Sequence, residues 1–178
     1  MGLGATPGLE RVTSMTILGV AISDTLGFGS YAHRICCRAR QSFWALRTLV
    51  AHGLRGPPLH DVVRATTLAR MLYASPAWWG FTNRSEQDRL QAVVSRLVRF
   101  KYLLDDTLTF EQMCQRADTS LFSAVLADSG LVLHDLLPPV KVSTYHLRPR
   151  AHDRVIPPAD SDSLMLKTYN YTRMLYEK

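Results

Sequence analysis

The segment 30–52 reads SYAHRICCRARQSFWALRTLVAH, and the spacing of its apolar residues decides the fold class. Apolar side chains recur at intervals of three or four residues, which places them along one stripe of an α-helix. The stripe consists of Ile35, Ala39, Phe43, Leu46 and Val50. We therefore expect a helix from Ser30 to about His52, ended by the glycines and prolines that follow it.

Arginines flank this stripe along both edges. At about 100° per residue, Arg34 and Arg38 lie on one side of the stripe. Arg40 and Arg47 lie on the other side. The predicted helix therefore presents guanidinium groups on either side of its apolar face.

A second helix is expected from Pro58 or Leu59, positions at which proline is tolerated, and Pro76 should end or kink it. Its predicted inner face comprises Leu59, Val62, Val63, Thr66, Ala69 and Tyr73. The aromatic pair Trp78-Trp79 follows the proline. Large aromatic residues next to a proline kink anchor helix packing, and a platform for stacking nucleic-acid bases is the alternative interpretation.

The third predicted helix runs from Ser85 to about Leu103, with Ser85 and Asp88 as an N-terminal cap. Its apolar stripe comprises Leu90, Val93, Val94 and Leu97. The adjoining face gathers Arg89, Arg96 and Arg99. A fourth helix is expected from Thr109 to about Asp128, and Thr109 with Gln112 forms a capping box at its start.

Outside the helices, residues 16–22 read TILGVAI, a short apolar segment that predicts one β-strand. An isolated strand needs a partner, which we expect in a polypeptide segment that this chain does not contain. The predicted fold is mainly α: a helical bundle with one short N-terminal β-strand and an extended C-terminal tail. The predicted divisions are a disordered leader over 1–14, a helical domain over 15–136 and a Pro-rich basic tail over 137–178.

Charge is unevenly distributed over the chain. Residues 30–102 hold twelve basic and three acidic side chains, a balance of +9 against a net +6 for all 178 residues. Most of these basic residues are Arg, whose planar guanidinium group pairs with phosphate oxygens. A concentrated Arg-rich segment is typical of nucleic-acid binding, and a solvated helical surface is the alternative.

The tail carries a second basic pattern. His146, Arg148, Arg150, His152 and Arg154 recur at every second residue, so an extended chain would point them the same way. Such a row of cations would follow a phosphate backbone. A solvated tail with a chance alternation explains the pattern equally well.

Catalytic and metal sites are not expected. The chain has three cysteines, Cys36, Cys37 and Cys114. This odd number favours free thiols in a reducing compartment over disulfides or a zinc site. Asp105-Asp106 follows Tyr102 at the wrong distance for the aromatic-x-Asp-Asp box of polymerases, so we expect it to separate two helices. No signal peptide or membrane span is predicted, which favours an intracellular location, cytoplasmic or nuclear, without membrane contact or cofactor.

Several short motifs follow one another along the chain in a characteristic order. Ile17-Leu18-Gly19-Val20 is followed by Leu26 and His33, by Leu72-Tyr73 with Pro76, by Trp79-Gly80 and by Leu90-Gln91. The tail adds Tyr145-His146-Leu147-Arg148-Pro149-Arg150-Ala151-His152. This order resembles the end of the palm, the thumb and the C-terminal tail of reverse transcriptases from non-LTR retrotransposons of the jockey-like group.

The resemblance implies a non-catalytic thumb fragment of an RNA-directed DNA polymerase. Such a thumb is a small helical bundle that holds the template–primer duplex, RNA or DNA, behind a palm that this chain lacks. The nucleic-acid-binding residues that charge and spacing propose are Arg40, Arg47, Arg89, Arg96, Arg99, Arg148 and Arg150. The alternative is a helical protein-interaction module, or an inactive transposon relic, without nucleic-acid binding.

Overall fold

The computed structural model describes residues 12–140 and 154–155, and the mainly helical fold predicted from the sequence is confirmed. The strands are β1 (Ser14–Ile17) and β2 (Val20–Ser23). The helices are α1 (Gly29–Ala51), α2 (Pro57–Val63), α3 (Ala69–Leu72), α4 (Ser75–Trp78), α5 (Arg84–Arg99) and α6 (Phe110–Ala127). A π-helical turn over Arg64–Leu68 joins α2 to α3, and 3-10 turns cover Trp79–Phe81 and Val132–Leu136.

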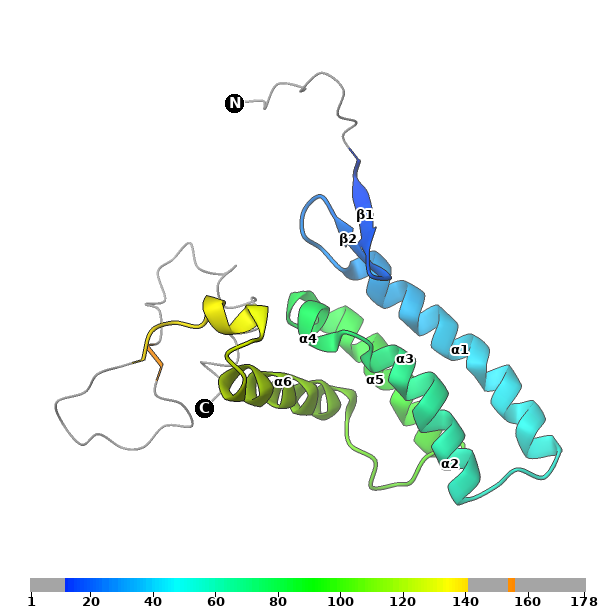
Figure 1. Ribbon diagram of the computed structural model, residues 1–178. Coiled ribbons are helices and arrows are strands. Elements are labelled where there is room, and N and C mark those ends of the chain that lie inside the picture. The colour runs from blue at the N-terminus through cyan, green and yellow to red at the C-terminus, as the bar shows by residue number, and fades with distance from the viewer. Residues whose placement is uncertain (1–11, 141–153, 156–178) are drawn as a thin grey trace.

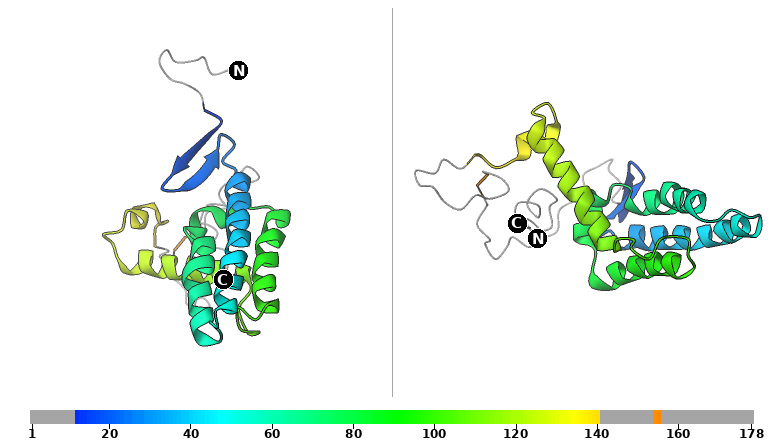
Figure 2. Two further views of the ribbon diagram at one scale, coloured as in Figure 1. Left: turned by 90° about the vertical axis from the view of Figure 1, so that its right-hand side faces the viewer. Right: turned by 90° about the horizontal axis from the view of Figure 1, so that it is seen from below.

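Helix α1 is the central rod of the bundle. It lies between α5 on one side and the α2–α3 rod on the other, as both views of Figure 2 show. Helix α6 crosses the α4 end of these rods and contacts α4 and α5 (Figures 1 and 2). The two edges of α1 therefore lie in two different seams, one with α5 and one with α3.

The predicted stripe of α1 faces the core. Ile35, Ala39 and Leu46 are buried, and Phe43 and Val50 are half-buried against the same core. The helix begins one residue before the predicted start and ends one residue before the predicted end. Gly53, with φ of 94°, follows in the left-handed region that glycine adopts at no steric cost.

The second predicted helix forms, but its inner face was only partly predicted. Leu59 and Val63 are buried as expected. Thr66, Ala69 and Tyr73 are exposed, and Thr67 and Met71 are buried instead. The cause is the π-helical turn over Arg64–Leu68, which adds one residue to a turn and so shifts every later side chain by one position. Buried positions consequently recur at every fourth residue instead of every 3.6.

The prediction of a single N-terminal strand was wrong, because this part of the chain forms two strands. The expected single strand is a hairpin in which β1 pairs antiparallel with β2, with Ile17 opposite Val20. Leu18 and Gly19 have positive φ values of 47° and 84°, the backbone signs of a two-residue hairpin turn. The partner strand therefore lies within the chain and not in a separate segment, and β1 begins at Ser14, inside the expected leader.

Trp78 and Trp79 anchor the packing of the bundle. Trp78 is fully buried, and its indole N–H donates to the carbonyl oxygen of Tyr73 at 2.9 Å. The rings of both tryptophans pack on Phe110 at the start of α6, with centroid distances of 6.4 and 5.4 Å. Burial leaves no face for a nucleic-acid base, so the packing interpretation is correct and the stacking platform is not.

The start and end of α5 differ from prediction. Asn83, not Ser85, caps the helix: its side chain accepts from the N–H of Glu86 at 2.9 Å, and the Glu86 carboxylate accepts from the N–H of Asn83. The helix ends at Arg99 because Lys101 turns into the left-handed region, with φ of 57°. The capping box of α6, Thr109 with Gln112, is confirmed.

Two further expectations bear on function. Cys36 and Cys114 are buried and Cys37 is half-buried, and no disulfide joins any two of these three described residues. In the described part of the chain, none of the helices combines the length and hydrophobicity needed to cross a bilayer.

Candidate nucleic-acid interface

The seam between α1 and α5 brings the predicted arginines of both helices together. Burial raises the pKa of the Cys36 thiol on α1, and the positive charges of Arg40 and Arg89 act in the opposite direction. Arg40 comes from α1 and Arg89 from α5, so both guanidinium groups lie close enough to affect the same thiol. The two helices therefore contribute to one basic surface.

Aromatic rings hold the next two guanidinium groups in place. The Arg96 guanidinium lies 5.0 Å from the ring centroid of Phe43 on α1 and 5.5 Å from that of Phe100. The Arg99 guanidinium lies 5.4 Å from the centroid of the same Phe100 ring. Cation–π contacts of this length orient a guanidinium group while leaving its N–H donors free for a ligand. Both arginines are exposed, so these donors face solvent.

Arg47 and Trp44 complete the α1 side. Arg47 follows Arg40 by seven residues, which places both on the same side of the helix, and both are exposed. Trp44 lies between them, and 77% of its surface is exposed. Sequence analysis missed Trp44, although its position four residues after Arg40 and three before Arg47 gave the signal. We call the surface formed by these residues the Arg face: Arg40, Trp44, Arg47, Arg89, Arg96 and Arg99.

A shallow groove of about 520 Å³ runs along α5 beside the Arg face. Arg96 and Arg99 line one part of it, and Gln91 and Ser95 supply uncharged polar groups. The acidic residue in the groove is Asp88, which pairs with Arg84 at 3.1 Å. The carboxylate therefore has a cation of its own outside the Arg face.

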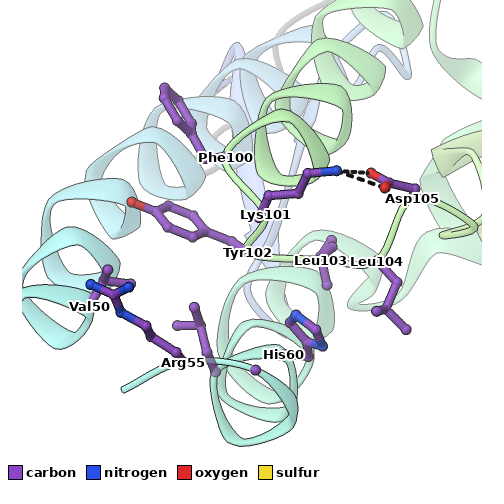
Figure 3. Close-up of a pocket in the computed structure, with 11 residues that line it drawn as sticks. Val50, Arg55, His60, Phe100, Lys101, Tyr102, Leu103, Leu104 and Asp105 are labelled. Carbon is purple, nitrogen blue, oxygen red and sulfur yellow. Dashed lines mark hydrogen bonds and ion pairs between the residues drawn. The ribbon is translucent and has the colours of Figure 1, made fainter. Parts of the chain in front are cut away.

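A second hollow, of about 510 Å³, lies where the loop between α1 and α2 meets the loop after α5 (Figure 3). Its polar rim includes Arg55, His60 and Lys101, and its walls include Leu59 and Leu103. Lys101 donates to both carboxylate oxygens of Asp105 at 2.7 Å, so its ammonium group is paired with a carboxylate. No member of the Arg face lines this hollow among the described residues, but Phe100, whose ring contacts Arg96 and Arg99, does, so the hollow adjoins the Arg face.

The acidic pair Asp105-Asp106 lies in the loop between α5 and α6, where both residues are exposed. Asp105 is engaged by Lys101. Within residues 12–140 and 154–155, no three His, Cys, Asp or Glu side chains gather in a way that could hold a metal ion. The expectation that the pair separates two helices is confirmed, and the absence of catalysis stays a prediction.

The arginines of the tail fall mostly outside the described residues. Arg148 and Arg150 belong to this undescribed part, so their predicted role stays a prediction. Arg154 is described: its guanidinium donates to the carbonyl oxygen of Pro138 at 3.2 Å, next to a bridge between Val140 and Arg154.

Comparisons of the chain with protein-family models, with curated proteins and with solved structures found no match. The resemblance to non-LTR reverse transcriptases therefore depends on the sequence motifs alone.

Proposed function

We propose that this chain is a nucleic-acid-binding helical domain that holds a duplex on its Arg face, in the manner of the thumb of a non-LTR reverse transcriptase. The observation that carries the proposal is the gathering of five exposed arginines from two helices along one seam. Guanidinium groups spread along a surface match the repeated phosphates of a duplex backbone better than a single small anion. Contacts of this kind position a duplex without reading its bases.

The motifs behind the resemblance also support the proposal, because they meet in space. The Tyr73 hydroxyl donates to the carbonyl oxygen of Leu18 at 3.0 Å, across a separation of 55 residues. Trp79 and Leu90 lie in the same core. Residues that are distant in sequence thus have a joint structural role.

The proposal predicts salt-sensitive binding without sequence preference. Five phosphate contacts give a slope of about −4.5 for the logarithm of the binding constant against the logarithm of salt concentration. Fluorescence anisotropy with two labelled duplexes of unrelated sequence, titrated at several salt concentrations, measures this slope. Equal affinities and a steep slope are expected for both duplexes. A tenfold preference for one sequence at every salt concentration would contradict backbone binding.

In this proposal the chain makes no phosphodiester bonds. Nucleotidyl transfer uses carboxylates that hold two metal ions, and the acidic pair Asp105-Asp106 is exposed in a loop. Primer extension with magnesium and all four nucleotides should therefore give no product above background. Extension that disappears in an Asp105→Ala variant would overturn this assignment.

The alternative, a protein-interaction module, is favoured by a different surface. The hairpin exposes Met15, Ile17 and Leu18, with exposed fractions of 54%, 46% and 86%. Exposed apolar groups on a two-stranded sheet favour contact with another polypeptide. Both roles are compatible if the hairpin contacts the palm of a parent polymerase while the Arg face holds the duplex. A chain that binds no duplex at low salt would leave the interaction module as the better account.

A further inference from the structure

The other edge of α1 carries a second basic site, away from the Arg face. A hollow of about 360 Å³ lies between α1, α3 and the hairpin turn. The residues that line it include Tyr31, Arg34 and Arg38 on α1, Arg70 on α3, and Tyr73. This volume is at the lower end of the range of about 300–1,000 Å³ for small-molecule sites, so it suits a small ligand and not a duplex.

The charges that line the hollow have one sign. Three of its lining residues are arginines, and none of the described lining residues is acidic. The ion pairs Arg84–Asp88 and Lys101–Asp105 lie elsewhere. Three cations around one small concave space repel one another, and an anion placed among them removes that repulsion.

Hydrogen bonds fix the walls of the hollow before any ligand arrives. Arg34 donates to the carbonyl oxygen of Gly19 at 2.8 Å, and its guanidinium lies 5.3 Å from the ring centroid of Tyr31. Tyr73 donates to the carbonyl oxygen of Leu18 at 3.0 Å. Both carbonyl groups of the hairpin turn are thus engaged, and the turn is held over the α1–α3 seam. A site whose walls are already positioned loses less entropy on binding.

Arg38 and Arg70 are the groups that remain for a ligand. Both are exposed, one on α1 and one on α3. Burial raises the pKa of the Tyr31 hydroxyl, and the charges of Arg34 and Arg38 act in the opposite direction, so both guanidinium groups lie near that residue. Tyr73 is 52% exposed and offers an aromatic surface beside them.

We propose that this hollow binds a phosphate monoester group, bound by Arg38 and Arg70, with Tyr73 against the attached nucleoside. A dianionic phosphate offers several acceptor oxygens, which match guanidinium groups converging from two helices. The group can belong to a free mononucleotide or to the 5′-phosphorylated end of a strand. The described lining residues include no member of the Arg face, so this proposal does not depend on the duplex-binding one.

Calorimetric titration of the full chain in a phosphate-free buffer tests the proposal. The probes are adenosine 5′-monophosphate against adenosine, and a 5′-phosphorylated single-stranded hexanucleotide against the same strand with a 5′-hydroxyl. The parent should bind at least one phosphorylated probe more tightly than its unphosphorylated counterpart, by about tenfold or more. The pair of probes that shows the difference identifies the source of the phosphate.

Two variants locate the site. Arg38→Gln combined with Arg70→Gln should remove the preference for the phosphorylated probe, and circular dichroism should show an unchanged helical signal because both side chains are exposed. The matched control, Arg89→Gln with Arg96→Gln, removes the same charge from the Arg face and should keep the preference. The proposal is overturned if neither phosphorylated probe binds better than its counterpart. It is also overturned if the Arg38/Arg70 variant retains the preference, or if the control variant loses it equally.

Discussion

Replacing Leu97 with Asp should unfold the helical core. Leu97 is fully buried on α5, in the stripe with Leu90, Val93 and Val94 that packs against the core. The substitution removes apolar packing and places a carboxyl group where water cannot reach it. The combined cost is about 5 kcal/mol or more, which is comparable with the total stability of about 5–15 kcal/mol of a small domain.

Two further variants separate burial from helix propensity. Leu97→Ala should leave a folded protein that is less stable by about 2–5 kcal/mol, because it creates a cavity without a buried charge. Ala92→Asp introduces the same carboxyl group on the same helix at an exposed position and should cost less than about 1 kcal/mol. Thermal unfolding followed by circular dichroism measures all three. A Leu97→Asp protein that melts like Ala92→Asp would show that α5 does not pack as described.

Replacing Arg89, Arg96 and Arg99 together with Gln should abolish most duplex binding while leaving the fold intact. All three side chains are exposed on α5, and Gln keeps the helix propensity of Arg. At about 1 kcal/mol for each charge-assisted contact, the loss of three weakens binding at low salt by about a hundredfold. The weakening should be the same for duplexes of unrelated sequence, since backbone contacts carry no sequence information.

A control with the same change in net charge distinguishes a specific surface from general electrostatic attraction. Arg55, Arg64 and Arg116 are exposed and lie outside the Arg face. Their triple replacement with Gln also lowers the net charge by three. We expect this control to bind duplex within about threefold of the parent at about 0.1 M salt, because these side chains make none of the proposed phosphate contacts and a charge without a contact is screened over about 10 Å.

The helices that the sequence predicted well are those whose pattern is purely local. The stripes of α1 and α5 and the capping box Thr109 with Gln112 depend on residues three or four apart, and each is present. The same spacing placed Arg34 and Arg38 on one edge of α1 and Arg40 and Arg47 on the other. The structure assigns these edges to the α3 seam and the α5 seam respectively.

The features that sequence analysis missed depend on contacts between distant residues. The π-helical turn buries Thr67, whose hydroxyl lies 2.9 Å from that of Ser42 on α1, and no periodicity in α2 predicts such a partner. The hairpin needs a positive φ at Leu18, which an L-residue with a side chain seldom adopts. Hydrogen bonds from Tyr73 and Arg34 to the carbonyl groups of the turn hold it in place.

The candidate site shows the same difference between local patterns, which the sequence predicts, and contacts between distant residues, which it does not. Charge and helical spacing placed the five arginines of the Arg face beside the apolar stripes, because charge and periodicity are local properties of the sequence. Trp44 was missed because an apolar residue beside the stripe of a helix is expected to contribute to the core. Its exposure follows from the position of α5, which covers Phe43 and leaves Trp44 outside the seam.

The salt dependence of duplex binding by the parent, the α5 triple variant and the charge-matched control tests the central claim most directly. On a plot of the logarithm of the binding constant against the logarithm of salt concentration, the parent and the control should share a slope of about −4.5. The α5 triple variant should give a slope of about −1.8, because only Arg40 and Arg47 remain. If the α5 triple variant instead binds with the slope and affinity of the parent, the Arg face does not hold the duplex and the thumb-like function is wrong.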